Sequence, residues 1–358
     1  MAEAIAPPVK IGIVSLAMYH GNFWSQAIQA SEQADFIGIW DDDPERGEAG
    51  ALAYGTRYIS ELGILLASCD AVCITSETHR HAEFVEQAAA AGCHVLCEKP
   101  LATSIADCER IIAAVERSGI TFMQSYPKRF DPVNAELKRL IDSGELGTIT
   151  LMRVRHGHLY GLLRSSPPVW KRDPATSGGG ALLDEGSHGA DLIRWLLGEP
   201  DAVMAAVSNL ALAHSVEDLG VAVFLYDNGP ICELAASGTF AAGDNSVEIF
   251  GTKGTAVLSG VDLASRDVTQ GSFLKVCRLT EENLTDPTTR QWEVSSMTPG
   301  FQSTPEFHQQ NPLQFIKALV NGEPAPVSVR DGLRSLQMIV SAYEAARTGT
   351  TVRIPPAR

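Results

Sequence analysis

Short apolar runs separated by amphipathic stretches fill the first third of the chain, and this alternation constrains the fold more than any other feature. The runs are IGIV, FIGIW, AVCIT, HVLC and ITFMQ, which lie between Val9 and Ser125. Each run is followed by a stretch with helical spacing, for example HRHAEFVEQAAAAG. Strands that alternate with helices predict a parallel sheet with crossover helices on both faces. We therefore predict a Rossmann-type, doubly wound α/β domain over residues 1–126.

The pattern changes after residue 126, where longer alternating strands replace the short buried runs. These strands are TITLMRVRHGH, AVMAAVSNLAL, VAVFLYDNGPICELAASG and SVEIFGTKGTAVLSG. The turns DNG and GTKG join neighbouring runs, which predicts a mostly antiparallel sheet. Helices are expected at 132–147, 181–198, 312–322 and 332–349. We therefore predict an α+β domain over residues 127–358.

Charge and composition exclude several function classes. The chain has 28 Lys and Arg against 43 Asp and Glu, a net charge of −15, so it has no basic surface for nucleic acid or anionic lipid. No apolar run approaches the roughly 18 residues of a membrane-spanning helix, and the N-terminal MAEAIAPP lacks the features of a signal peptide. The seven cysteines are scattered, which favours reduced thiols. We expect a cytoplasmic protein that acts on a small molecule.

The turn after the first apolar run lies where a dinucleotide-binding protein carries G-x-G-x-x-G. Its three glycine positions hold Ser15, Ala17 and His20. Ala17 intrudes little on an approaching pyrophosphate, and a helix beginning near Gly21 would direct N–H groups and its positive dipole end at phosphate. On the fingerprint alone, a Rossmann-like fold that binds no nucleotide is the favoured interpretation.

An acidic residue follows the second apolar run, in IWDDDPERG. Asp41 lies where such folds place the acid that accepts hydrogen bonds from the adenosine ribose. Asp42 and Asp43 would repel a 2′-phosphate, so a dinucleotide bound here would be NAD rather than NADP. The alternative, that these aspartates form a turn and an N-cap, is equally compatible with the sequence.

Two further motifs carry groups suited to catalysis. In CHVLCEKPLA, Glu98, Lys99 and Pro100 follow the fourth apolar run, at the strand end where open α/β sheets bind ligands. In SGGGALLDEGSHGADLIRWLLG, Asp184, His188 and Asp191 share one helix face. An Asp one turn before a His suits an oriented general base. Metal binding by this face is a less favoured alternative, and we predict no metal ligands.

These motifs together resemble the Gfo/Idh/MocA oxidoreductase family, which includes glucose–fructose oxidoreductase and inositol dehydrogenase. The resemblance extends from VKIGIV through CEKPLA, RFDP, GELGTI and VEIFGTKGTA to AYEAARTGTTVRIP. It implies NAD as cofactor, a sugar or polyol substrate, and a homo-oligomer, a dimer or tetramer, formed through an open second-domain sheet. It also implies that Glu98 lies near the nicotinamide ribose, Lys99 contacts the reacting hydroxyl, His188 takes its proton, and Asp184 binds substrate and orients His188.

Further site residues are expected around these motifs. For the cofactor they are Ser15, Ala17, His20, Asp41, Thr75, Glu77, His81, Glu98 and Arg129. For the substrate they are Tyr126, His156, Trp170, Arg172 and Asp184, with His158, Tyr160 and Lys171 as further pocket candidates. The expected activity is hydride transfer between a nicotinamide and a secondary hydroxyl or ketone. Two alternatives stay open: an NAD-dependent glycosidase that oxidises its sugar transiently, and a non-catalytic nucleotide sensor.

Overall fold

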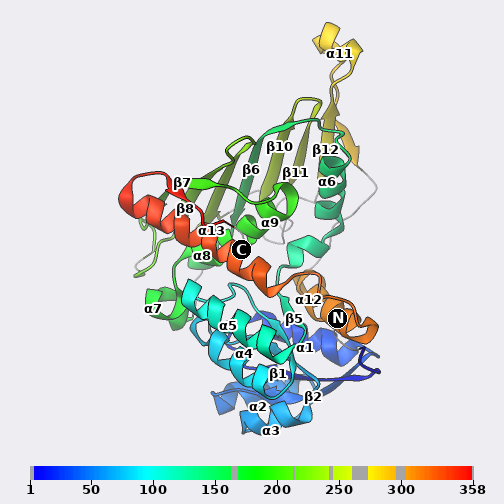
Figure 1. The fold of residues 1–358 in the computed structure, drawn as a ribbon, viewed down its shortest axis with the longest axis vertical. Coiled ribbons are helices and arrows are strands. Elements are labelled where there is room, and N and C mark those ends of the chain that lie inside the picture. The colour runs from blue at the N-terminus through cyan, green and yellow to red at the C-terminus, as the bar shows by residue number, and fades with distance from the viewer. Residues whose placement is uncertain are drawn as a thin grey trace. The chain divides into compact units, whose positions relative to one another are not determined.

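The computed structural model describes residues 4–162, 168–212, 214–241, 245–259, 273–295 and 304–356. The chain forms two compact units. The Rossmann unit comprises Met1–Pro127, Ala175–Gly178 and Pro305–Leu336. The second unit comprises Lys128–Pro174, Gly179–Thr304 and Gln337–Arg358. Each unit contains one sheet (Figure 1).

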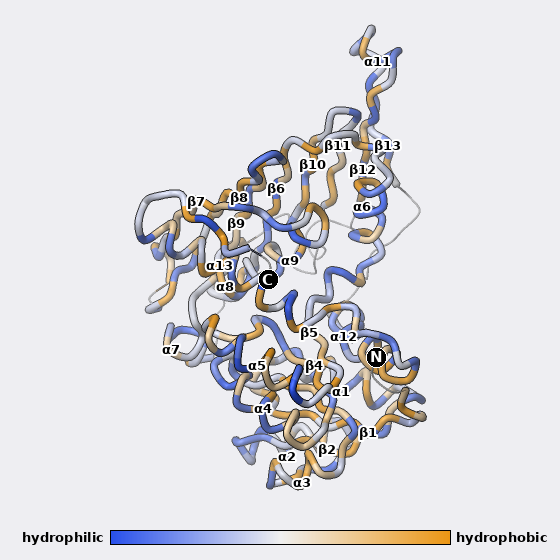
Figure 2. Tube along the Cα trace, in the orientation of Figure 1, coloured by the Kyte–Doolittle hydropathy of each residue, from blue (hydrophilic) through white to orange (hydrophobic). Residues whose placement is uncertain are grey.

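The sheet of the Rossmann unit is parallel and five-stranded, with the order β2-β1-β3-β4-β5. Its strands are β1 (Val9–Val14), β2 (Ala34–Trp40), β3 (Ala71–Ile74), β4 (His94–Cys97) and β5 (Phe122–Gln124). The residues of β3 are all buried, as expected of a strand covered on both faces. Figure 2 shows hydrophobic residues along these strands. The predicted doubly wound fold is confirmed.

Most helices of this unit follow its strands, as the alternation predicted, and one further helix comes from later in the chain. They are α1 (His20–Ala30), α2 (Pro44–Ala53), α3 (Leu62–Ser68), α4 (His81–Ala90), α5 (Ile105–Ser118) and α12 (Thr304–Asn321). The last of these was expected to begin at Pro312, but it begins at Thr304 and runs through that proline. The additional turns include Phe307 and His308, whose buried side chains hold this segment in the unit.

Within the described ranges, the second sheet has nine strands in the order β13-β12-β11-β10-β6-β9-β8-β7-β14. Its strands are β6 (Ile149–Gly157), β7 (Ala202–Ser208), β8 (Leu219–Leu225), β9 (Ile231–Ser237), β10 (Ser246–Gly251), β11 (Gly254–Ser259), β12 (Phe273–Arg278), β13 (Glu293–Ser295) and β14 (Val352–Arg353). Every neighbouring pair is antiparallel except β6 and β9, which are parallel. The predicted large, mostly antiparallel sheet is confirmed.

The remaining helices include those that pack on the second sheet. They are α6 (Pro132–Asp142), α7 (Pro174–Ser177), α8 (Ala181–Asp184), α9 (Gly186–Leu197), α11 (Glu281–Thr285) and α13 (Val329–Thr348), with 3-10 turns at Thr78–Arg80, Pro127–Phe130, Tyr160–Leu162, Val169–Arg172 and Pro287–Thr289. The single helix expected at 181–198 is divided at Glu185 into α8 and α9. The His188 N–H donates to the Glu185 carbonyl three residues back, which tightens the chain at this point.

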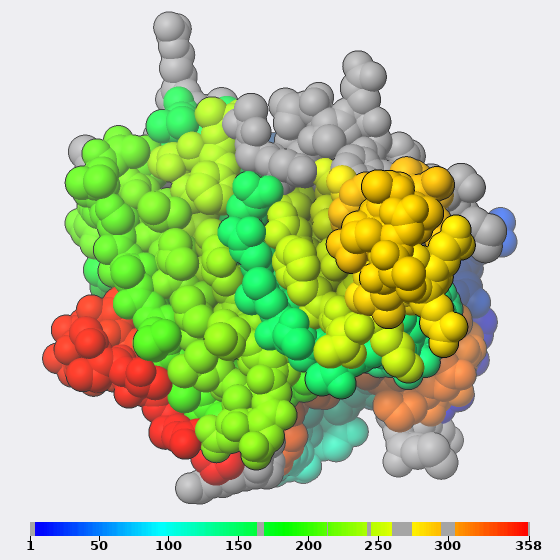
Figure 3. Space-filling model, turned by 90° about the horizontal axis from the view of Figure 1, so that it is seen from above, coloured from blue at the N-terminus to red at the C-terminus, as the bar shows by residue number. Residues whose placement is uncertain are grey.

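Helices α8 and α9 contact β6, β8 and β9 on one face of the second sheet. Figure 3 shows strand residues forming much of the visible surface of the other face. Met204 and Ile231 are exposed hydrophobic side chains on this uncovered face. Among the described residues, no helix combines the length and apolar character needed to cross a membrane.

Candidate active site

The turn after β1 keeps a glycine-like backbone although it contains no fingerprint glycine. Ser15 occupies the first glycine position with a φ of 66°, in the left-handed region that side chains with a Cβ rarely adopt. Its N–H donates to the Trp40 carbonyl at 2.7 Å, and its hydroxyl accepts from the Ala17 N–H at 3.2 Å. The backbone path of the fingerprint is therefore held by neighbouring hydrogen bonds rather than by a glycine at Ser15.

The N-terminus of α1 fits a phosphate group. Tyr19 is the N-cap residue of this described helix, its side chain makes no capping hydrogen bond to the helix N–H groups, and no acidic residue lies in the first turn. Such helix ends attract anions through N–H groups and the helix dipole. A Cβ on Gly21 would collide with the side chains of Thr75 and Leu16. Gly21 thus provides the close helix–sheet packing of the third fingerprint glycine, one residue after the expected position of His20.

Asp41 is buried at the end of β2 and is bonded to the first turn. Its Oδ2 accepts from the Leu16 N–H at 2.7 Å, and Arg46 donates to both carboxylate oxygens at 2.9 and 2.6 Å. Asp43 accepts from two N–H groups at the start of α2 and caps that helix. The capping interpretation is therefore correct for Asp43, whereas Asp41 links the end of β2 to the turn.

The Glu98-Lys99-Pro100 loop follows β4, and its two charged side chains are buried. The Lys99–Pro100 peptide bond is cis. His20 Nδ1 lies 2.7 Å from Glu98 Oε1, and the His20 ring stacks on His308 at a centroid distance of 3.8 Å. Burial raises the pKa of Glu98 above its ordinary value, although Lys99 and His308 act in the opposite direction. His20, which occupies the third glycine position of the fingerprint, therefore contacts this loop.

The other side chains expected near the cofactor lie after β3. Thr75 donates to the Ser15 carbonyl, and Glu77 lies two residues further on, before α4. His81 is fully buried, with Nδ1 3.0 Å from the Pro100 carbonyl oxygen. Burial lowers the pKa of His81, so its imidazole is neutral at physiological pH. His81 therefore contacts the backbone of the loop that contains Lys99.

Tyr126, which was expected to contact the substrate, is buried just after β5.

In the second unit, the helix motif brings an acid and a histidine to neighbouring turns. Asp184 ends α8 and His188 lies in the first turns of α9. Lys171 Nζ lies 2.8 Å from Asp184 Oδ2, and both side chains are largely buried. The His188 ring stands edge-on to His156, with centroids 5.1 Å apart. Lys171, a pocket candidate from the sequence, is therefore the ion-pair partner of the predicted substrate-binding acid.

Arg129 and Asp191 form a bidentate ion pair within this unit. The two nitrogen–oxygen distances are 2.9 and 2.6 Å, and Asp191 is buried. Asp191, the last acid of the helix motif, therefore anchors Arg129, which was expected to contact the cofactor. The glycine run before α8 needs a glycine at position 180, because a Cβ on Gly180 would collide with the backbone of Glu217.

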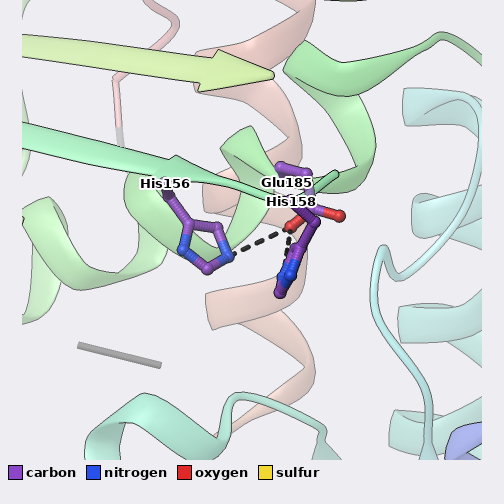
Figure 4. Close-up of side chains that lie close together, drawn as sticks. All are labelled: His156, His158 and Glu185. Carbon is purple, nitrogen blue, oxygen red and sulfur yellow. Dashed lines mark ion pairs between the residues drawn. The ribbon is translucent and has the colours of Figure 1, made fainter. Parts of the chain in front are cut away.

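Two of the pocket candidates meet an acid that the sequence did not single out. His156 Nε2 and His158 Nε2 lie 3.1 and 3.3 Å from the same oxygen, Oε2 of Glu185 (Figure 4). Burial of Glu185 opposes ionisation, but the two imidazoles outweigh it and lower the pKa of this carboxyl. Glu185 lies directly after the predicted Asp184, so the signal available in the sequence was its position in the D-E-G-S-H segment.

Aromatic and cationic candidates lie around Lys171. Its Nζ is 5.5 Å from the Trp170 ring and 5.8 Å from the Tyr160 ring. The Arg172 carbonyl accepts from the Ser215 N–H at 3.3 Å. The second unit therefore gathers His156, His158, Tyr160, Trp170 and Asp184 around a small set of charged groups. Such a mixture of aromatic surface and hydrogen-bonding groups suits a polyhydroxylated ligand.

Comparison with known proteins identifies two segments that together cover most of the chain. Residues 9–126 match the model of an oxidoreductase family with an NAD-binding Rossmann fold, and residues 134–257 match the GFO/IDH/MocA C-terminal domain. The chain belongs to the Gfo/Idh/MocA oxidoreductase family. Family membership confirms the resemblance expected from the sequence, and it makes the protein an oxidoreductase with an NAD-binding fold.

Relatives of this Gfo/Idh/MocA protein cover almost its whole length. Inositol 2-dehydrogenase of Rhizobium meliloti is 25% identical over 346 residues, covering 93% of this chain and 96% of that protein. D-apiose dehydrogenase of Paraburkholderia graminis is 26% identical over 332 residues, covering 90% of this chain and 83% of that protein. The solved structure of aldose-aldose oxidoreductase from Caulobacter crescentus, complexed with glycerol, has a TM-score of 0.81 and 25% identity, covering 96% of this chain and 99% of that chain.

Proposed function

We propose that this protein transfers a hydride between NAD and a secondary hydroxyl or ketone of a sugar, cyclitol or related polyol. The observation that carries the proposal is the joint presence of Lys99 in its buried loop and of Asp184 and His188 on neighbouring helical turns. Relatives named for inositol and D-apiose dehydrogenation support this substrate class. When bound, NAD supplies the hydride acceptor.

The chain's own residues supply the proton chemistry. His188 accepts the proton of the reacting hydroxyl as a general base. Lys99 stabilises the negative charge that develops on that oxygen. Asp184, fixed by Lys171, accepts hydrogen bonds from substrate hydroxyls and limits the positions that the substrate adopts.

The preference for NAD over NADP rests on the charges after β2. Asp41, Asp42 and Asp43 oppose a 2′-phosphate, while Arg46 and Arg80 pair with them. The carboxylates outnumber the two arginines in this cluster. The adenosine ribose would take the place of Arg46 as the hydrogen-bond partner of Asp41. Arg46 can leave because its side chain is partly exposed, whereas Asp41 is buried. Isothermal titration with both dinucleotides tests this preference: NAD should bind more tightly, and Asp42→Asn should narrow the difference. Tighter NADP binding by the unmodified protein would contradict it.

One experiment separates the proposed activity from its two alternatives. The purified protein is incubated with NAD and a panel of cyclitols and aldoses, and NADH absorbance is followed over time. A dehydrogenase accumulates NADH in proportion to turnover. Release of the aglycone from an aryl glycoside without NADH would instead identify a glycosidase. Ligand binding in a thermal-shift assay, with neither reaction across the panel, would favour the sensor.

The open face of the second sheet is the proposed contact between copies of the chain. Its exposed Met204 and Ile231 lie on the same face as ion pairs from Arg153 to Glu233 and Glu248. Hydrophobic side chains among complementary charges suit a self-complementary interface. Sedimentation velocity tests the assembly: Met204→Lys together with Ile231→Lys should shift a dimer or tetramer towards the monomer. A parental protein that sediments as a monomer at all concentrations would contradict the contact.

A further inference from the structure

Two histidines and a glutamate converge on one point of the second unit. His156 is in β6 and His158 follows it at i+2, so the two side chains leave the strand on the same side. Glu185 enters from the junction of α8 and α9 (Figure 4). One nitrogen from each imidazole and one carboxylate oxygen all lie within 4.8 Å of one another. The function proposed above uses none of these three groups as acid or base.

The two nitrogen–oxygen distances of the cluster fit a shared metal ion. Zinc lies about 2.1 Å from imidazole nitrogen and carboxylate oxygen, so two ligands of one ion at ordinary bond angles lie roughly 3.0 to 3.4 Å apart. The distances from Glu185 Oε2 to His156 Nε2 and His158 Nε2 are 3.1 and 3.3 Å. Both distances fall in the range for ligands of one ion.

The donor set selects the class of ion. Two imidazoles and a carboxylate suit zinc and neighbouring first-row divalent metals, whereas calcium and magnesium prefer oxygen ligands alone. Three protein ligands also leave a coordination position open, as in zinc sites with His₂Glu ligands. We propose that His156, His158 and Glu185 bind a divalent first-row transition metal ion of the zinc class.

The cluster is buried on one side and partly exposed on the other, which suits both the binding of a metal ion and its entry from solvent. The side chains of His156 and Glu185 are 3% and 7% exposed, so the ion would be held away from bulk water. The side chain of His158 is 31% exposed, which leaves a path from solvent. A buried site open on one side is typical of an ion that exchanges a ligand.

The open coordination position of the ion would hold a substrate oxygen, and this inference rests on the proposed function. His156 stands edge-on to His188, with ring centroids 5.1 Å apart. A hydroxyl oxygen of a polyol on the ion would lie near the proposed base. The substrate class best suited to this arrangement carries vicinal hydroxyls, one for the ion and one for the base.

The binding test uses the metal alone. Full-length protein is treated with a chelator, desalted and titrated with Zn²⁺ by calorimetry. One ion should bind per chain, and Co²⁺ should give visible d–d bands on the same protein. His158→Gln and Glu185→Gln should each weaken Zn²⁺ binding by roughly 10- to 100-fold or more. Removing even a residue that only hydrogen-bonds to a metal ligand typically weakens metal affinity by about that factor. His214→Gln, which changes a partly exposed histidine of the same unit, should bind as the parent does.

Two outcomes would overturn the site. The first is a folded parent protein that binds no Zn²⁺, which would make the three side chains an ion-paired cluster. The second is Zn²⁺ binding that His158→Gln leaves unchanged, which would place the ion elsewhere. Unfolding curves of the metal-free variants check that each is folded. Because this titration uses neither substrate nor NAD, a protein that binds one Zn²⁺ but shows no turnover supports the site and contradicts the proposed function.

Discussion

His20 Nδ1 lies 2.7 Å from Glu98 Oε1, which joins the first turn to the loop after β4 across 78 positions of the sequence. Both side chains are buried. A residue in a glycine position of the fingerprint therefore has a contact that glycine cannot make. The turn has His20, which bonds to the loop that contains Lys99, where the fingerprint has a conformationally free glycine.

Restoring glycine at this position should therefore weaken the protein. His20→Gly removes the partner of a buried carboxyl, and leaving a buried polar group without its partner typically costs about 1–3 kcal/mol. We expect a loss of that order in the free energy of unfolding, measured by denaturant titration. Gln29→Gly, at an exposed position of the same helix, is the control and should cost about 1 kcal/mol or less. Equal losses in the two variants would contradict the importance of the His20–Glu98 pair.

The left-handed backbone of Ser15 predicts an unusual order of stabilities. Ser15→Ala and Ser15→Gly both remove the hydroxyl, but only alanine keeps a Cβ at a φ of 66°. Ser15→Gly should be more stable than Ser15→Ala by about 1 kcal/mol, since left-handed backbone costs roughly 1–2 kcal/mol in other residues. Ser25, inside α1, provides the control, where alanine should be the more stable of the same two replacements. Thermal unfolding of the four variants checks both orders.

The raised pKa of Glu98 predicts a pH dependence of stability. The folded protein retains a proton that the unfolded chain releases above pH 4.5, so this contribution is full below pH 4.5 and is lost as pH rises through the folded pKa. His20, His81, Lys99 and His308 face or influence this carboxyl. Glu98→Gln does not ionise, so its stability relative to the parent should increase as pH rises.

Denaturant titrations at a series of pH values measure this difference. Glu32→Gln, which replaces an exposed carboxylate of the same unit, is the control and should follow the parent closely. A Glu98→Gln variant whose difference from the parent stays constant above pH 4.5 would show that burial does not hold a proton on Glu98.

The proposed catalytic groups predict a kinetic pattern. His188→Ala should lower kcat by roughly 10²- to 10⁴-fold, the usual effect of removing a positioned general base, and Lys99→Ala should act similarly. The double variant should lose less than the product of the two losses, because both residues act in one chemical step. NAD binding, measured by calorimetry, should persist in His188→Ala. His214→Ala is the control, and near-parental turnover of His188→Ala would remove that residue from the chemistry.

The sequence by itself determined the two sheets and the order of the main elements. Buried runs such as residues 11–14 and Ala71–Ile74 predict parallel strands because a strand covered on both faces is apolar throughout. The motif after Gly180 also predicts helical turns that carry Asp184 and His188, since helical spacing is a local property. These features depend on residues a few positions apart, and periodicity reports them directly.

Only the tertiary structure decided which side chains meet. His20 contacts Glu98, Lys171 contacts Asp184, and Glu185 contacts His156 across long stretches of chain. The expected single helix at 181–198 gave no reason to assign a role to Glu185, because the break after Asp184 has no strong local signature. Such pairs depend on strand register and on how helices pack on the sheet, and both are set by burial of the whole core rather than by any one segment.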